Sequence, residues 1–92
     1  SSIVFVGPSD MSERRDGQLQ TYQMIPIIDD ALHQMAVKEE IGYFSLYQHM
    51  GGQGSMIVWK EKGLAGGDYV HFTRKGADKA GDMLADWLME QQ

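Results

Sequence analysis

The sequence contains no cysteine, only two prolines, and fewer cationic than anionic side chains. The absence of cysteine excludes a disulfide framework, a thiolate nucleophile and zinc bound through sulfur, and it leaves the compartment open. Eight Lys and Arg against thirteen Asp and Glu give a net charge of −5. Surfaces that bind nucleic acid or anionic membranes need clustered cations, which this chain lacks. We therefore expect no nucleic-acid partner.

Long apolar runs are also lacking. None approaches the roughly 20 residues of a membrane-spanning helix, and no basic and then apolar signal segment opens the chain. The 92 residues, 42% of them apolar, are expected to form one soluble globular unit with a modest core. Because the apolar run at residues 3–6 follows Ser1 and Ser2 directly, we expect the chain to be part of a larger protein.

The first half of the chain predicts a βαβ unit. Residues 3–6 are typical of a strand buried on both faces of a parallel sheet. From Thr21 onward the pattern indicates a helix with Pro26 in its first turn and Gly42 as its stop. Residues 43–47 are short and aromatic-rich, as expected for a second, parallel strand. The helix residues expected to face the core are Ile28, Ala31, Leu32, Met35 and Ala36.

The segments that connect these elements are expected to be a polar loop, a glycine-rich loop and one short helix. Residues 11–20 are polar, and we expect a surface loop there. Gly51, Gly52 and Gly54 follow the second strand and suggest a tight bend or a close approach to a ligand, but the loop lacks the Gly-Lys-Ser/Thr ending of a phosphate loop. Ser55 is expected to cap a short helix over residues 56–62.

The last third predicts a long amphipathic helix over residues 74–89. Thr73 is in the position of an N-cap, and Gly76 and Gly81 suggest close backbone packing. One apolar stripe is expected to face the core, consisting of Ala77, Ala80, Leu84, Trp87 and Leu88.

Asp68 and His71 lie three residues apart just before this helix. A carboxylate that accepts a hydrogen bond from one imidazole nitrogen leaves the other nitrogen as a base, which is the orienter-and-base half of a nucleophilic triad. The alternative is a helix-entry loop with a solvated Asp and a half-buried His. His33 and His49 have no metal-ligand spacing, and we interpret them as surface or packing histidines.

The block Gly-Asp-Tyr-Val-His-Phe-Thr-Arg-Lys-Gly-Ala at residues 67–77, followed by a terminal helix, resembles the last conserved block of the SGNH (GDSL-type) hydrolases. Residues 3–10 resemble the late parallel strand of that fold, which ends in Gly-Pro. Residues 44–59 resemble the Phe-x-x-Leu/Met-Tyr…Met-Gly-Gly…Ser-Met…Trp stretch of bacterial carbohydrate-esterase-like members. The resemblance covers nearly the whole chain but only the last third to half of the family's fold.

This resemblance implies the C-terminal part of a flavodoxin-like three-layer α/β/α fold, with parallel strands and flanking helices. It implies a lipase-like acylhydrolase or esterase that works through an acyl-enzyme, with Asp68 as the orienter and His71 as the general base. No cofactor or metal is implied. Gly51 and Gly52 are candidate substrate-loop residues, as are Met56 and Trp59, although the latter two are equally compatible with the core.

The departures from the family concern the nucleophile and the oxyanion hole. The family's Gly-Asp-Ser, Gly and Gly-x-Asn-Asp blocks are absent, and the chain contains no Asn. The turn at residues 7–10 does not make Ser9 a convincing nucleophile, because in the family the Asp precedes the Ser. We therefore expect this chain alone to be inactive, to need the missing N-terminal part of the same protein, and to self-associate without it.

Two functional classes remain open. One is the C-terminal part of an esterase acting on a small-molecule or glycan ester, periplasmic or secreted in the parent protein. The other is a non-catalytic α/β interaction module that binds a partner through the glycine loop or through residues 11–20. The sequence does not select the ester.

Overall fold

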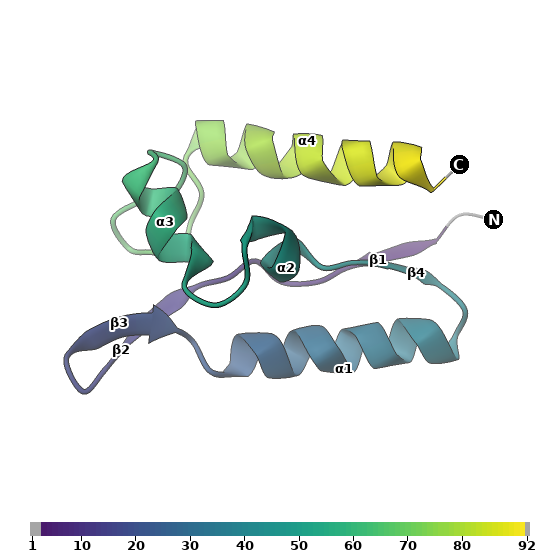
Figure 1. The fold of residues 1–92 in the computed structure, drawn as a ribbon, viewed down its shortest axis with the longest axis horizontal. Helices are drawn as coiled ribbons and strands as arrows, with labels where there is room; N and C mark the ends of the chain where they lie inside the picture. Colours follow the sequence, from purple (N-terminus) through teal and green to yellow (C-terminus); the bar gives the residue numbers. More distant parts are fainter. Residues whose placement is uncertain (1–2, 92) are drawn as a thin grey trace.

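Two parallel strands lie between two long helices (Figure 1). β1 (Val4–Val6) pairs with β4 (Gly42–Phe44) in the register Val4↔Gly42, Phe5↔Tyr43 and Val6↔Phe44. α1 (Met24–Lys38) connects the two strands, and α4 (Arg74–Glu90) follows them. The structure is a computed structural model and describes residues 3–91. The predicted parallel βαβ unit is confirmed.

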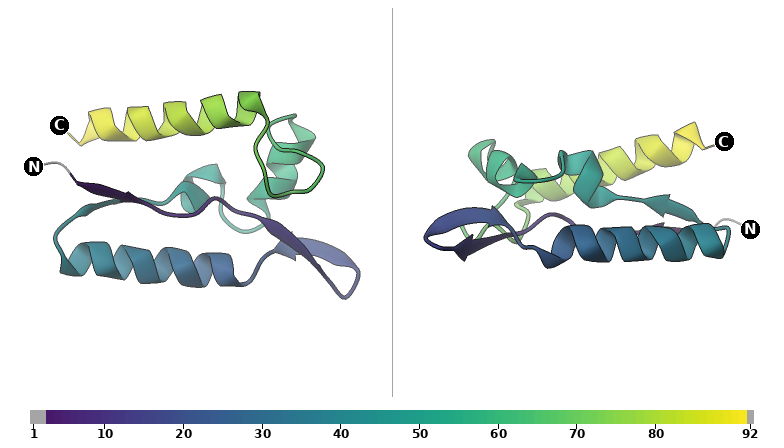
Figure 2. Two further views of the ribbon diagram at one scale, coloured as in Figure 1. Left: turned by 180° about the vertical axis from the view of Figure 1, so that it is seen from behind. Right: turned by 60° about the horizontal axis from the view of Figure 1, so that its bottom comes forward.

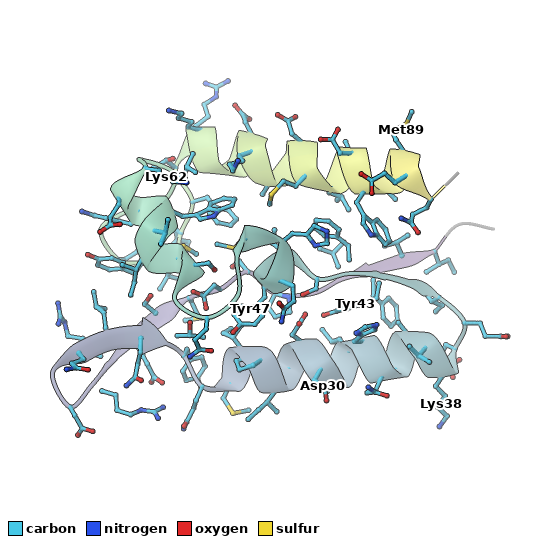
Figure 3. The ribbon with its side chains drawn as sticks, viewed as in Figure 1. Asp30, Lys38, Tyr43, Tyr47, Lys62 and Met89 are labelled. Carbon is cyan, nitrogen blue, oxygen red and sulfur yellow. The ribbon has the colours of Figure 1, made fainter. Side chains whose placement is uncertain are left out.

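Neighbouring residues of β4 face the two different helices. The hydroxyl of Tyr43 donates to Asp29 of α1, and the Tyr43 ring stacks on His33 at a centroid distance of 5.0 Å (Figure 3). The ring of Phe44 instead meets Trp87 of α4, with centroids 5.5 Å apart. Because side chains alternate between the faces of a strand, α1 and α4 cover opposite faces, which produces three layers.

A β-hairpin occupies the segment that the sequence indicated as a surface loop. β2 (Ser12–Arg15) pairs antiparallel with β3 (Gln18–Thr21). The two residues between the strands, Asp16 and Gly17, have φ of 53° and 79°, as a type I′ turn requires. The loop prediction was therefore wrong, and the Asp-Gly dipeptide is the signal that indicates the hairpin.

The predicted core stripe of α1 is correct in part, because Leu32 and Ala36 lie on the buried face as expected. The residues that face the sheet are Ile25, Asp29 and Ala36, which are buried, and Leu32, which is half-buried. The other three predicted residues, Ile28, Ala31 and Met35, are exposed. The observed face follows steps of four, three and four residues, and the three exposed residues lie on one flank of it. The helix ends at Lys38, four residues before Gly42.

The segment after β4 is more helical than predicted. The strand ends at Phe44, and Leu46–Met50 forms α2, which begins with Ser45 accepting a hydrogen bond from the N–H of Gln48. α3 (Ser55–Glu61) follows Gly54, and Ser55 does not cap it. Instead the buried carboxylate of Asp10 accepts from the N–H of Met56 over 2.9 Å.

The main apolar cluster lies between α3, the loop after it and α4. Its buried members are Met50, Met56, Trp59, Leu64 and Ala65. Ala80 and Met83 of α4 pack against it, whereas Ala77 and Leu88, which were predicted to face the core, are exposed. Thr73 is the N-cap of α4, as predicted, and accepts from the N–H of Gly76.

Both ends of the described chain lie at the same end of the molecule, away from α3 and the hairpin (Figure 2). The strands run from that end toward α2, so the carboxyl ends of β1 and β4 open toward the cluster of shorter elements. Within residues 3–91 no helix is long and apolar enough to cross a membrane.

Candidate functional site

A narrow loop between α3 and α4 carries Asp68 and His71. Its two arms meet at an isolated antiparallel bridge between Ala65 and Phe72, and the N–H of Gly66 donates to the carbonyl of His71 over 2.8 Å. At the base of the loop, the N–H of Thr73 donates to the carbonyl of Leu64, over 3.0 Å. The sequence between the arms is therefore confined to a short turn.

The side chains of Asp68 and His71 contact each other directly. Asp68 Oδ2 and His71 Nδ1 are 2.7 Å apart. The other carboxylate oxygen, Oδ1, accepts from the N–H of Val70 over 2.9 Å and from the N–H of His71 over 3.0 Å. An ionised carboxylate only accepts hydrogen bonds, so Nδ1 carries a proton and Nε2 of the neutral ring is left with its lone pair.

The charge of Asp68 is stabilised by this arrangement. The hydrogen bond from the His71 side chain, followed by the backbone N–H groups of His71 and Val70, holds the pKa of the Asp68 carboxyl well below its usual range. Both side chains are accessible, 52% for Asp68 and 82% for His71. The pair thus consists of an ionised carboxylate and an imidazole that a second molecule or another part of the protein can reach.

Contacts with distant residues attach this turn to the rest of the fold. The N–H of Ser12 donates to the carbonyl of Tyr69 over 3.0 Å, which joins the start of the hairpin to the turn. Tyr69 itself has φ of 59°. The Phe72 ring lies 5.3 Å from that of Trp59, so the residues on either side of His71 are fixed to the core.

Thr73 and Gly76 determine where α4 leaves the turn. Thr73 Oγ1 donates to the carbonyl of Gly63 over 2.8 Å and also accepts from Gly76. A Cβ added at Gly76 would lie 1.7 Å from the carbonyl oxygen of Leu64. The predicted close packing is therefore present at Gly76, but it is absent at Gly81, where an added Cβ would meet nothing within 4 Å.

The structure separates the candidate substrate-loop residues into two groups. Gly51 and Gly52 have φ of 127° and 78°, as expected for a tight bend. Met56 and Trp59 are buried in the apolar cluster, so their side chains are not accessible in this chain. The indole N–H of Trp59 donates to the carbonyl of Met50 over 3.1 Å, and this contact fixes the base of the glycine loop.

Two buried carboxylates were not identified from the sequence. Asp29 accepts from the hydroxyls of Tyr43 and Ser45. Asp10 accepts from Met56 N–H, and burial raises the pKa of its carboxyl. Asp29 could not be recognised from the sequence, because its core-facing position depends on how the sheet packs against α1, and only there does a carboxylate require partners.

A metal centre is not formed by the part of the chain that the structure describes, since no group of three or more His, Cys, Asp or Glu could hold an ion there. The His33 ring is stacked on Tyr43, and the His49 ring lies 4.3 Å from that of Phe44. The interpretation of both as packing histidines agrees with these contacts.

Comparisons with known proteins gave one informative similarity. No family model and no curated protein matches the sequence. A solved structure of a peptidoglycan O-acetylesterase is similar, with a TM-score of 0.88 and 27% sequence identity. The similarity covers 99% of this chain and 26% of the other, so this chain spans about a quarter of that protein's length. The expected fold class, parallel strands with flanking helices, is confirmed.

Proposed function

We propose that this chain supplies the general base, His71, and its orienter, Asp68, to a serine esterase of the SGNH type. The observation that carries the proposal is the 2.7 Å contact between Asp68 Oδ2 and His71 Nδ1, which leaves Nε2 accessible. The similarity to a peptidoglycan O-acetylesterase supports ester hydrolysis as the reaction. The pair alone cannot attack an ester, so the nucleophile comes from residues outside this chain.

In this reaction Nε2 of His71 takes the proton of a serine hydroxyl as the oxygen attacks the ester carbonyl carbon. The C–O bond to the alcohol then breaks, and the imidazolium returns its proton to the leaving alkoxide. Water repeats the sequence on the acyl-enzyme and releases the acid. Asp68 accepts a hydrogen bond from Nδ1–H of His71 throughout and stays ionised, as its lowered pKa favours.

The substrate class is proposed to be an O-acetylated glycan. The similar protein removes O-acetyl groups from peptidoglycan by its description, and the same triad chemistry serves any ester. A glycan ester outside the cytoplasm would place the parent protein in the periplasm or among secreted proteins. Residues 1–92 then form the C-terminal portion of a single catalytic domain, and these residues alone are inactive.

The test uses the full-length product of the gene that encodes this sequence. The enzyme is assayed with p-nitrophenyl acetate and with an O-acetylated glycan, and His71→Ala is expected to abolish turnover of both while the circular dichroism spectrum is unchanged. His33→Ala is the matched control, because that ring is stacked on Tyr43 on the opposite face of the sheet from α4. Full activity in His71→Ala would contradict the assignment of the base.

The encoded sequence provides a second test. A Gly-Asp-Ser and a Gly-x-Asn-Asp upstream of Ser1 would supply the nucleophile and an oxyanion donor, and an active-site serine probe should then label the first of these. If the gene encodes nothing of the kind and no hydrolysis is detected, the non-catalytic α/β interaction module becomes the better interpretation.

A further inference from the structure

Most cations of the chain lie around the end of α3 and the start of α4. Residues 60–79 contain five of the eight Lys and Arg and only three Asp and Glu, so their net charge is +2 in a chain whose net charge is −5. All five cations are exposed. We call them the basic end, which consists of Lys60, Lys62, Arg74, Lys75 and Lys79.

A contact between Gly63 and Thr73 brings the two parts of the basic end together. Thr73 Oγ1 donates to the carbonyl of Gly63 over 2.8 Å, so Lys62 and Arg74, which flank these two residues in the sequence, lie on adjoining segments. Neither cation has an ion-pair partner within the residues that the structure describes. The fold therefore gathers like charges, which repel each other, without a carboxylate paired to them.

The stability of α4 does not explain its first cations. Arg74 and Lys75 occupy the first turn, which contains no acidic residue. The amino end of a helix carries a partial positive charge, so cations are unfavourable there. Lys75 and Lys79 are also four positions apart, a spacing at which like charges destabilise a helix. Residues that break a local rule in this way are expected at functional sites, and here we expect the charge to serve binding.

Lys60 lies next to the Asp68–His71 turn, over the ring of Tyr69. Its Nζ is 6.0 Å from the centroid of that ring, which is the outer limit of a cation–π contact. Tyr69 has φ of 59°, a left-handed conformation that glycine adopts without strain and an aromatic residue rarely adopts. The ring must therefore contribute something that glycine could not. It packs against the main apolar cluster and orients the ammonium group of Lys60 at the turn.

A second cation of the basic end contacts an aromatic ring near the turn. Nζ of Lys79 lies 6.0 Å from the centroid of the Trp59 ring, and that ring lies 5.3 Å from the ring of Phe72, the residue after His71. Two ammonium groups are thus oriented by rings that adjoin the segment carrying the base. The positive charge is therefore placed where a substrate of His71 would bind.

We propose that the basic end binds carboxylates of the glycan whose ester reaches His71, with Lys60 pairing with one of them beside the turn and Tyr69 as its positioning residue. This inference rests on the proposed function and narrows the substrate to an acetylated glycan that carries carboxylates. Positive charge around the site raises the local concentration of such a substrate. Nucleic acid fits less well, because a duplex carries one charge per about 1.7 Å, whereas the excess here is two charges.

The experiment compares two forms of one substrate. The full-length gene product is assayed on soluble fragments of O-acetylated peptidoglycan whose carboxylates are either free or converted to methylamides. The wild type is expected to have a kcat/KM at least about 3-fold higher for the free acids, mainly through a lower KM. Because exposed charges are screened by salt, this preference should disappear as the ionic strength rises from about 0.02 to about 0.5 M.

Variants identify the residues that produce the preference. Lys60→Gln should remove most of it by raising KM for the free acids, and Lys60→Glu should lower it further. Tyr69→Leu keeps an apolar side chain in the cluster but removes the ring, so it should also lower the preference, whereas Tyr69→Phe retains the ring and should restore it. Lys38→Gln is the matched control, because Lys38 is exposed at the end of α1 that is far from α3 (Figure 3).

Each outcome supports or overturns the proposal. Equal kcat/KM for the two forms in the wild type would overturn it and leave the proposed function intact, and so would a preference that Lys60→Gln retains or that Lys38→Gln also removes. Stronger inhibition by a DNA oligonucleotide than by the free-acid fragments would indicate a nucleic-acid surface instead. Hydrolysis of neither form would reject this proposal together with the proposed glycan substrate. If Lys60→Gln does not fold, the comparison of Tyr69→Leu with Tyr69→Phe still decides.

Discussion

The carbonyl oxygen of Leu64 occupies the space that a side chain at Gly76 would need. A Cβ at that position would lie 1.7 Å from this oxygen and 2.7 Å from the carbonyl carbon. α4 therefore starts against the backbone of the loop that carries Asp68 and His71, and the placement of the pair depends on a glycine that makes no contact with either residue.

Gly76→Ala and Gly81→Ala should consequently have opposite effects. Alanine at Gly81 replaces a glycine inside an exposed helix with open space around it, and should stabilise the protein by about 0.5–1 kcal/mol. At Gly76 the same gain is outweighed by the clash, which costs about 1–3 kcal/mol or more. Urea denaturation of both variants measures the difference, and two variants of equal stability would contradict the close packing.

Asp68→Asn should reduce kcat without changing the fold. Asn retains one oxygen that can accept from the N–H groups of Val70 and His71, but it removes the charge that stabilises the imidazolium and favours the active tautomer. The reduction can reach about 10⁴-fold where such a carboxylate orients the base, with KM little changed. Asp78→Asn, on the exposed side of α4, is the control. An unchanged kcat in Asp68→Asn would show that the contact has no catalytic role.

Tyr43→Phe should change the pH dependence of the free energy of unfolding in the alkaline range. Burial, followed by the hydrogen bond to Asp29, raises the pKa of Tyr43 above its ordinary value of 10.0. Above pH 10 the unfolded chain loses the phenolic proton while the folded chain keeps it, so the stability from this group falls as pH rises. The variant should lose about 1.5–3 kcal/mol at neutral pH and show a shallower decline between pH 9 and 11. An unchanged alkaline slope would contradict this assignment.

The free energy of unfolding of Asp10→Asn, relative to that of the wild type, should increase as pH rises. Burial raises the pKa of Asp10 above 3.8, so the folded wild type binds this proton more tightly than the unfolded chain. Its stability therefore falls as pH increases above 3.8 until the folded carboxyl also ionises. Asn carries no charge and can still accept from Met56 N–H. Urea denaturation at pH 4 and pH 7 measures the difference, with Asp30→Asn as an exposed control (Figure 3).

The parallel strand pair, both long helices and the Thr73 cap could be predicted from the sequence, because each depends on local patterns. The contact between Asp68 and His71 could also be anticipated, since three residues in a turn are within reach of each other. The full buried face of α1 could not, because Ile28 and Met35 stand at helical spacing on the exposed side as well, and only the position of the sheet selects which residues are covered.

Long-range contacts account for the other features that differ between the sequence-based predictions and the structure. Asp10 replaces Ser55 as the acceptor at the start of α3 over a separation of 46 residues, and no local pattern indicates this. Met56 and Trp59 could be assigned either to the core or to a binding loop, and only their packing against Leu64 and Ala65 places them inside. The hairpin is different, since the local Asp16-Gly17 dipeptide is itself typical of a type I′ turn.

The hydrogen bonds inside the Asp68–His71 turn have a consequence for folding. They join residues at most ten positions apart, from Gly63 to Thr73, so closing the loop has a small entropic cost. The parallel pairing of β1 with β4 instead joins residues that are far apart in the sequence, such as Val4 and Gly42, and such contacts form slowly. We expect Asp68 and His71 to adopt their geometry early on refolding, and the pairing of β1 with β4 to form later.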